Sequence, residues 1–257
     1  MDWKVLSPIL IVSAAIIVVI LERLRPFDRG QKFFREGFFT DLIAYGLVQS
    51  YLLGLIISQC IKEVDQSTGL SRLHIVSDWP VITQLLLFFV THDLYIYWFH
   101  RLQHVSPLLW RTHEAHHSVR DVDWMAGTRS HPLEILINQT VEFLPMTLLG
   151  AHPDVVLMKA TLDAVWGMYI HSNINVRSGV LQYLINGPEM HRWHHAVEVR
   201  DRNFATKLAC WDYFFGTAYR PANKRPLGYG LVEGTFPHDY LRQVLWAFRV
   251  SSSRQRS

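Results

Sequence analysis

The chain has 257 residues, 18% of them charged and 13% aromatic, and its formal net charge is +3. This composition is apolar for a soluble enzyme, and no lysine and arginine run of the kind that binds nucleic acid precedes the short tail at residues 254–256, so nucleic acid is not an expected partner. The two cysteines, Cys60 and Cys210, provide no disulfide framework, cysteine zinc site or haem attachment motif.

Long apolar stretches in the N-terminal part of the chain predict membrane-spanning helices. They are Val5–Leu21, Leu42–Ile61 and Val81–Phe99, and the last carries His92 and Asp93 in its second half. Each has about the length that a helix needs to cross the hydrocarbon core of a bilayer. The first lacks a basic leading region and a cleavage site, so a retained anchor is expected rather than a removed signal peptide.

Two shorter apolar stretches, Ile135–Gly150 and Val155–Ile170, predict a membrane-embedded hairpin that turns near residues 150–153. They are interrupted by ionisable residues, which inside a membrane usually face a bundle interior or a cavity.

The charges of the loops predict the topology. The segment Glu22–Phe38 contains five arginines and lysines, whereas Lys62–Asp78 contains two. The positive-inside bias therefore places Glu22–Phe38 in the cytosol, and everything after His100 emerges on that side as well.

Most of the 14 histidines lie between His92 and His195, and three clusters of them have the spacing of metal ligands on a helix. The clusters occupy residues 100–104, 113–117 and 191–195. Positions i, i+3 and i+4 share one helix face, so each cluster presents two or three imidazoles together. A mononuclear zinc site needs three or four ligands, whereas these eight imidazoles suit two metals with an open position on each. Ligand type alone does not separate iron, zinc and copper.

Two other interpretations compete with a dinuclear catalytic site. The second cluster satisfies H-E-x-x-H, the signature of zinc hydrolases in which Glu114 would be the general base, and this predicts a membrane zinc metallohydrolase. Such an enzyme would use one further ligand, which leaves His100, His104 and most of the third cluster unexplained. A metal-binding membrane protein without catalytic activity, such as a transporter or sensor, should carry its histidines in the middle of its spans. The clusters lie at span ends and in polar segments, which favours catalysis.

The clusters resemble the boxes H-x-x-x-H, H-x-x-H-H and H-x-x-H-H of the membrane fatty acid hydroxylase and sterol desaturase superfamily, in the same order. The likeness extends to the lead-in Asp93–Arg101, to Arg129–Glu134 and His171–Ile174 between the boxes, and to Asn203–Phe204 and Trp211–Thr217 after them. The expected fold is all-α: a multi-pass transmembrane helical bundle with a cytosolic helical cap that holds a dinuclear metal site. Its divisions are N-terminal transmembrane helices over residues 1–92, a histidine-box catalytic domain with the hairpin over 93–221, and a C-terminal cytosolic tail over 222–257.

By position in the boxes, the resemblance implies eight metal ligands: His100, His104, His113, His116, His117, His191, His194 and His195. Family members often use further histidines between the second and third boxes, which adds His171 and His131 as candidates. For His131 the alternative is a residue whose imidazole caps the start of a helix. A ligating imidazole usually donates its other N–H to a carboxylate or carbonyl. Asp93, Glu114 and Asp212 are the candidate carboxylates, and for Asp93 a purely structural role is the alternative.

The resemblance implies an O2-dependent enzyme with two iron ions, for which zinc may stand in, that hydroxylates or desaturates a membrane lipid such as a sterol, a fatty acyl chain or an ether lipid. Both reactions use the same ligands, so the sequence leaves the choice open. The chain carries no dinucleotide fingerprint, cysteine ligand set or haem motif, so a separate electron-transfer protein is the expected donor. The expected location is the bacterial inner membrane or the endoplasmic reticulum.

Overall fold

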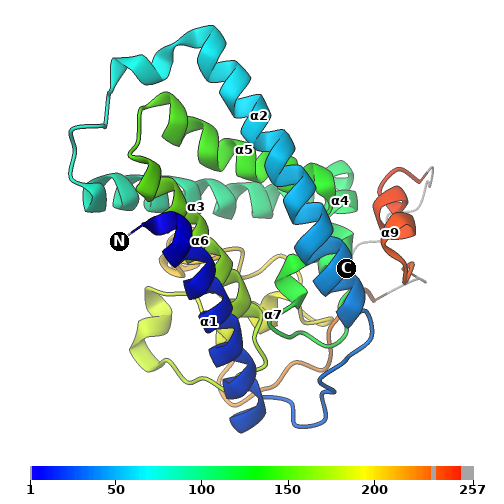
Figure 1. Ribbon diagram of the computed structural model, residues 1–257. Coiled ribbons are helices and arrows are strands. Elements are labelled where there is room, and N and C mark those ends of the chain that lie inside the picture. The colour runs from blue at the N-terminus through cyan, green and yellow to red at the C-terminus, as the bar shows by residue number, and fades with distance from the viewer. Residues whose placement is uncertain (1, 233–235, 250–257) are drawn as a thin grey trace.

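The structure is a computed structural model that describes residues 2–232 and 236–249. All regular secondary structure in these ranges is helical (Figure 1). No β-strand occurs in these ranges; two isolated bridges join loop residues. The α-helices are α1 (Trp3–Leu24), α2 (Ser50–Thr68), α3 (Val81–Val105), α4 (Pro107–His117), α5 (Pro132–Leu148), α6 (Pro153–His171), α7 (Pro188–His194), α8 (Cys210–Phe214) and α9 (Tyr240–Trp246). A π-helix, η1 (Thr40–Gln49), precedes α2, and short 3₁₀ turns are η2 (Leu70–Leu73), η3 (Ala126–Thr128) and η4 (Gly179–Tyr183). The predicted all-α fold is confirmed.

Among the described residues, three helices are long and apolar enough to cross a membrane: α1, the continuous helix formed by η1 and α2, and α3. They coincide with the three predicted spans. On α1, Val5, Val12 and Ile16 are each more than half exposed. Such a continuous apolar surface on a helix is explained by contact with lipid. The two helices of the predicted hairpin are also present as α5 and α6, and the turn between them occupies residues 149–152.

The end of α1 is attached to the loops around the histidine-rich core. In Figure 1, α1 runs beside α6, and the hydroxyls of Ser7 and Thr161 lie 2.6 Å apart between them. At the other end of α1, Glu22 is buried, and its carboxylate accepts hydrogen bonds from the backbone N–H groups of Trp124 and Asn173. Burying a carboxylate is costly unless it is hydrogen-bonded, so these two contacts fix where α1 ends relative to the core.

Buried ion pairs join segments that are distant in the sequence. Arg35 contacts the carboxylates of Asp41 at 2.8 Å and Asp123 at 2.7 Å, and Arg129 makes two further bonds to Asp41. The network connects the loop after α1, the start of η1 and the segment between α4 and α5.

Lys159 forms the centre of a second buried network. Its ammonium lies 2.7 Å from Glu142 and 2.5 Å from Asp163, and it donates to Nδ1 of His92 at 3.0 Å. These side chains come from α3, α5 and α6. The ionisable residues that interrupt the apolar stretches therefore face the bundle interior, as expected for charges inside a membrane protein.

Replacing Lys159 by methionine tests this network. Lys159→Met leaves the buried Glu142 without its cation, whereas Asp163 keeps Lys207 at 3.1 Å, and breaking a buried pair costs about 3–5 kcal/mol. We expect the melting temperature in detergent to fall by roughly 6 °C or more. Lys62→Met, at an exposed position of α2, is the matched control and should leave it unchanged. Equal melting temperatures for both variants would show that the network contributes nothing to stability.

Candidate metal centre

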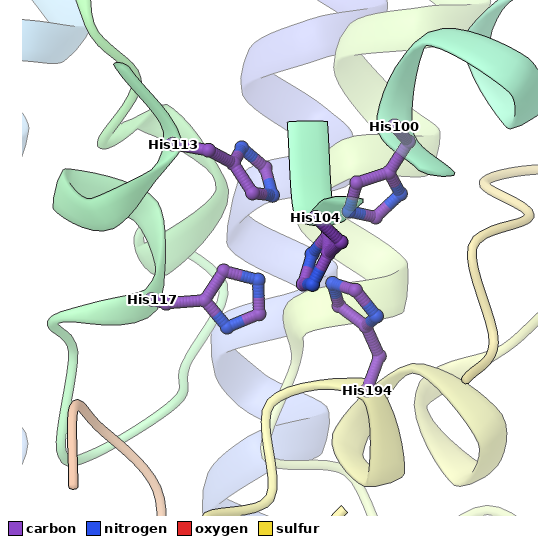
Figure 2. A group of neighbouring side chains, drawn as sticks. All are labelled: His100, His104, His113, His117 and His194. Atoms are coloured by element: carbon purple, nitrogen blue, oxygen red, sulfur yellow. The ribbon is translucent and has the colours of Figure 1, made fainter. Parts of the chain in front are cut away.

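Nine histidines from α3, α4, α6 and the α7 segment meet in the core as two adjacent groups. Within each group, one nitrogen of every imidazole lies within 4.8 Å of the others. The first group, shown in Figure 2 with its rings directed toward a common centre, consists of His100, His104, His113, His117 and His194. The second group consists of His116, His171, His191 and His195.

The local sequence explains how these side chains converge. Only Ser106 separates α3 from α4, and its hydroxyl caps the start of α4 while Pro107 occupies the first helical position. The first and second boxes therefore lie on consecutive helices that face each other. Within α4, the i and i+4 histidines of the box join the first group and the i+3 histidine joins the second. In the α7 segment the i+3 histidine joins the first group and the other two join the second. Each of these boxes thus contributes to both groups.

The nitrogens that face the centre of the first group have no partner. Nε2 of all five imidazoles is buried and makes no hydrogen bond to any described residue. Buried polar atoms in native proteins are nearly always satisfied, and a metal ion bound at this point would satisfy all five nitrogens. Neutral imidazole nitrogens with free lone pairs are suitable donors for iron, zinc or copper.

In the second group the ring nitrogens face one another directly. Nε2 of His171 lies 2.8 Å from Nε2 of His191 and 3.3 Å from Nε2 of His116. His171 and His116 each use Nδ1 to donate to a backbone carbonyl, so both direct an Nε2 lone pair at the same space. Facing lone pairs repel each other, and a cation between them removes the repulsion. This arrangement also fits a metal ion.

Burial keeps the imidazoles outside the spans neutral. Desolvation, followed by the neighbouring imidazoles, lowers the pKa well below the usual value for every box histidine of α4 and of the α7 segment: His113, His116, His117, His191, His194 and His195. A neutral imidazole is the form that binds a metal.

Partners at Nδ1 fix the orientation of several rings. His100 donates to the carbonyl of Phe204 at 2.8 Å, and His194 donates to the carbonyl of Arg202 at 2.9 Å. His113 instead contacts a carboxylate, Oε1 of Glu134, at 3.1 Å. A partner at Nδ1 selects the tautomer whose Nε2 lone pair is free for a metal.

Glu134 was missed by the sequence analysis. It lies in the first turn of α5, three residues after His131, inside a segment that already resembled the family. Its contact with His113 depends on how α4 and α5 pack, and helix periodicity alone does not predict this.

Of the three carboxylates selected from the sequence, Asp212 lies next to the site. It accepts hydrogen bonds from the backbone N–H groups of Phe204 and Ala205, so it holds the segment whose carbonyl accepts from His100. Asp93 is not paired with a histidine. It accepts from the hydroxyl of Thr206, from two backbone N–H groups and from the indole of Trp211, and thereby fixes the loop before α8.

The structure directs Glu114 away from the imidazoles. Both of its oxygens bind Arg249, at 2.7 and 2.8 Å, and it is buried in that contact. A general base must reach a metal-bound water. This geometry does not favour the zinc hydrolase interpretation.

His131 and His92 lie outside both groups. Nδ1 of His131 accepts from the N–H of Leu133 at the start of α5, and Nε2 contacts the carbonyl of Val244. His131 therefore has the helix-capping contact considered as its alternative. His92 lies near Glu142 and Asp163, but the ammonium of Lys159 already occupies the position of a cation among them.

A cavity of about 220 Å³ adjoins both groups. Histidines of both groups line one side, and Ile96, Phe99, Trp166 and Ile170 supply apolar walls. Glu142, Asp163 and other polar side chains line it as well. The cavity thus brings apolar surface next to the imidazoles.

Two all-imidazole groups lie side by side in a helical protein with membrane-type helices, and each of them could hold a metal ion. Residues 85–217, just over half of the chain, match the fatty acid hydroxylase family. The chain belongs to this family, and all nine grouped histidines lie within the match. Membership favours neither a zinc hydrolase nor a non-catalytic metal-binding protein.

Individual relatives agree with this assignment. The chain is 29% identical to an ornithine lipid hydroxylase of Rhizobium tropici over 92% of its own length and 73% of the relative. It is 30% identical to human alkylglycerol monooxygenase, with 56% of the chain and 32% of the relative aligned. It is 28% identical to a very-long-chain aldehyde decarbonylase of Oryza sativa, over 54% of each. No solved structure matches the chain significantly.

Metal content tests the grouping. His104→Ala removes a nitrogen of the first group and His191→Ala one of the second, and each should reduce the bound metal from two ions per chain to about one, as measured by elemental analysis. His131→Asn preserves a capping side chain and should retain both ions. Loss of metal in His131→Asn would restore this residue to the ligand set.

Glu134 provides a separate test of ring orientation. Glu134→Leu removes the acceptor for His113, and loss of such a partner weakens metal binding by about 10–100-fold. Glu134→Gln keeps an acceptor oxygen and should bind metal more tightly than the leucine variant. Chelator competition measures both affinities, and equal values for the wild type and Glu134→Leu would contradict the role of this contact.

Proposed function

We propose that this protein is an O2-dependent di-iron oxidoreductase that hydroxylates a membrane lipid. The observation that carries the proposal is the pair of adjacent all-imidazole groups, the first of which contains five buried Nε2 atoms without a partner among the described residues. Similarity to an ornithine lipid hydroxylase along 92% of the chain favours hydroxylation over desaturation. The same similarity supports a lipid as the substrate.

The proposed ligands are His100, His104, His113, His117 and His194 for one iron and His116, His171, His191 and His195 for the other. Bound iron would supply the activation of dioxygen that oxidation of an unactivated C–H bond requires. Imidazole ligands also accept zinc, which would occupy the groups without redox chemistry.

The chain's own residues would position the substrate and keep water away. Ile96, Phe99 and Ile170 offer an apolar wall to a hydrocarbon chain beside the imidazoles. The Nδ1 partners, such as Glu134 and the carbonyl of Phe204, hold the rings in fixed orientations while the substrate binds. Fixed geometry at the reacting carbon decides which hydrogen is removed.

We place the metal centre at the cytosolic side of the membrane. The basic loop after α1 contacts the core on the same side as the boxes, because Glu22 at the end of α1 binds the backbone of Trp124 and Asn173. His100 and His104 lie in the last turns of α3. The positive-inside bias of the loop supports a cytosolic location for both.

Lipid analysis under ¹⁸O₂ tests the proposal. Cells that express the wild-type chain should accumulate a lipid that carries one ¹⁸O atom, and cells with His116→Ala or His194→Ala should lack it while inserting the protein normally. A product that has lost two hydrogens without gaining ¹⁸O would identify a desaturase instead. An unchanged lipid profile together with peptide cleavage would support the zinc hydrolase alternative.

A further inference from the structure

The proposed reaction consumes electrons that the lipid does not supply. Conversion of R–H and O2 to R–OH and water takes up two electrons and two protons in each turnover. A carrier that delivers one electron at a time must therefore bind twice, at a place from which electrons can reach the metals. The need for such a carrier rests on the proposed function.

A large surface cavity lies on the side of the molecule where α1 ends. It has a volume of about 980 Å³ and is formed by the loop at residues 26–30, the segment at 175–182 and the loop at 220–226. Arg192 and Trp193 of α7 also line it. The cavity is distinct from the one beside the imidazoles, since no residue lines both.

The lining of this cavity is strongly basic. Its cations are Arg29, Arg177, Arg192, Arg220, Lys224 and Arg225, and all except Arg192 are exposed. The lining contains two carboxylates, Asp28 and Glu189, which accept hydrogen bonds from the backbone N–H groups of Gly30 and Ser178 respectively. The cavity thus has an excess of four positive charges. Within the described ranges, none of its exposed cations forms an ion pair with a carboxylate.

Aromatic rings hold some of these cations in place. The guanidinium of Arg192 lies 3.9 Å and that of Arg225 4.2 Å from the centre of the Phe27 ring. Burial lowers the pKa of Arg192 to about 10, which still leaves it charged at neutral pH. Two like charges held against one ring repel each other, and an anionic partner would relieve this repulsion.

The two α7 residues that line the cavity lie between the proposed metal ligands in the sequence. Trp193 lines the cavity and is followed directly by His194 of the first group. His191 and His195 of the second group flank Arg192 and Trp193 in the same segment. A helix with its side chains is about 10 Å across, so a redox centre seated in the cavity would be separated from both imidazole groups by roughly the thickness of one helix.

We propose that this basic cavity is the docking site for an acidic one-electron carrier protein of the ferredoxin or small cytochrome kind. Charge complementarity would speed the encounter and select the partner. An anionic lipid head group is the competing occupant, because the cavity begins close to the end of α1. The carrier is favoured because Arg177, Arg220 and Lys224 come from loops of the cap and because Trp193 and Arg192 connect the cavity to the ligand helix.

Charge reversal at the cavity tests the docking site in the full-length protein in nanodiscs. Arg177→Glu combined with Lys224→Glu changes two exposed lining residues for which no ion pair is seen among the described residues. The probe is an acidic [2Fe–2S] ferredoxin, whose Kd should rise tenfold or more at low ionic strength. The salt dependence of binding should also become weaker, because exposed charges are screened within a Debye length.

Two further double variants distinguish an effect on docking from an effect on folding and from an effect of overall charge. Arg200→Glu with Arg242→Glu reverses the same number of exposed charges outside the cavity and should keep the wild-type Kd. Arg177→Lys with Lys224→Arg conserves the charge of the cavity and should also keep it. An equal rise in Kd for the outside pair, or no rise for the cavity pair, overturns the proposal.

Binding to anionic vesicles tests whether a lipid head group, rather than the carrier protein, occupies the cavity. Detergent-purified variants are mixed with phosphatidylglycerol vesicles, and loss of vesicle binding in the cavity pair with an unchanged Kd for ferredoxin would assign the cavity to lipid and overturn the proposal. Ferredoxin binding that depends on the cavity but yields no hydroxylated lipid would support the docking site and contradict the proposed function. The two claims therefore fail separately.

Discussion

The core depends on the burial of nine imidazoles that converge in two groups, and five Nε2 atoms of the first group have no partner among the described residues. Polar atoms removed from water without partners cost free energy, and facing lone pairs add repulsion. Two metal ions would offset both costs by accepting every lone pair at once. The rest of the core can be understood from this requirement. The helices α3 and α4 and the α7 segment must each bring a histidine stripe to the same place, α6 must bring His171, and the residues behind them must hold the rings at the correct angle.

The charged side chains around the two histidine groups support the positions of the imidazoles and do not belong to either group. Asp212 fixes the backbone that accepts from His100, and Asp93 fixes the loop that follows. Lys159 binds the acidic residues of the hairpin, so no free carboxylate of that pair competes for the metals. Buried charges of this kind are satisfied by each other. The imidazole groups therefore remain all-nitrogen sites, beside a cavity with apolar walls.

Much of this could be predicted from the sequence because its signals are local. The length of the apolar stretches predicted the spans, and the i, i+3, i+4 spacing predicted that the histidines of each box share one helix face. The sequence could not predict that the histidines of α4 and of the α7 segment divide between the two groups, because this depends on how helices distant in the sequence cross. The contact of Glu134 with His113 and the ion pair of Glu114 with Arg249 are long-range in the same sense. Nor does hydropathy distinguish the π-helical start of the second span from an α-helix.

The central claim is that two metal ions lie in two separate imidazole groups, and anomalous scattering at the iron absorption edge tests it most directly. Crystals of protein purified with iron should show two anomalous peaks, one surrounded by His100, His104, His113, His117 and His194 and one by His116, His171, His191 and His195. A single peak, or a peak outside these groups, would contradict the account.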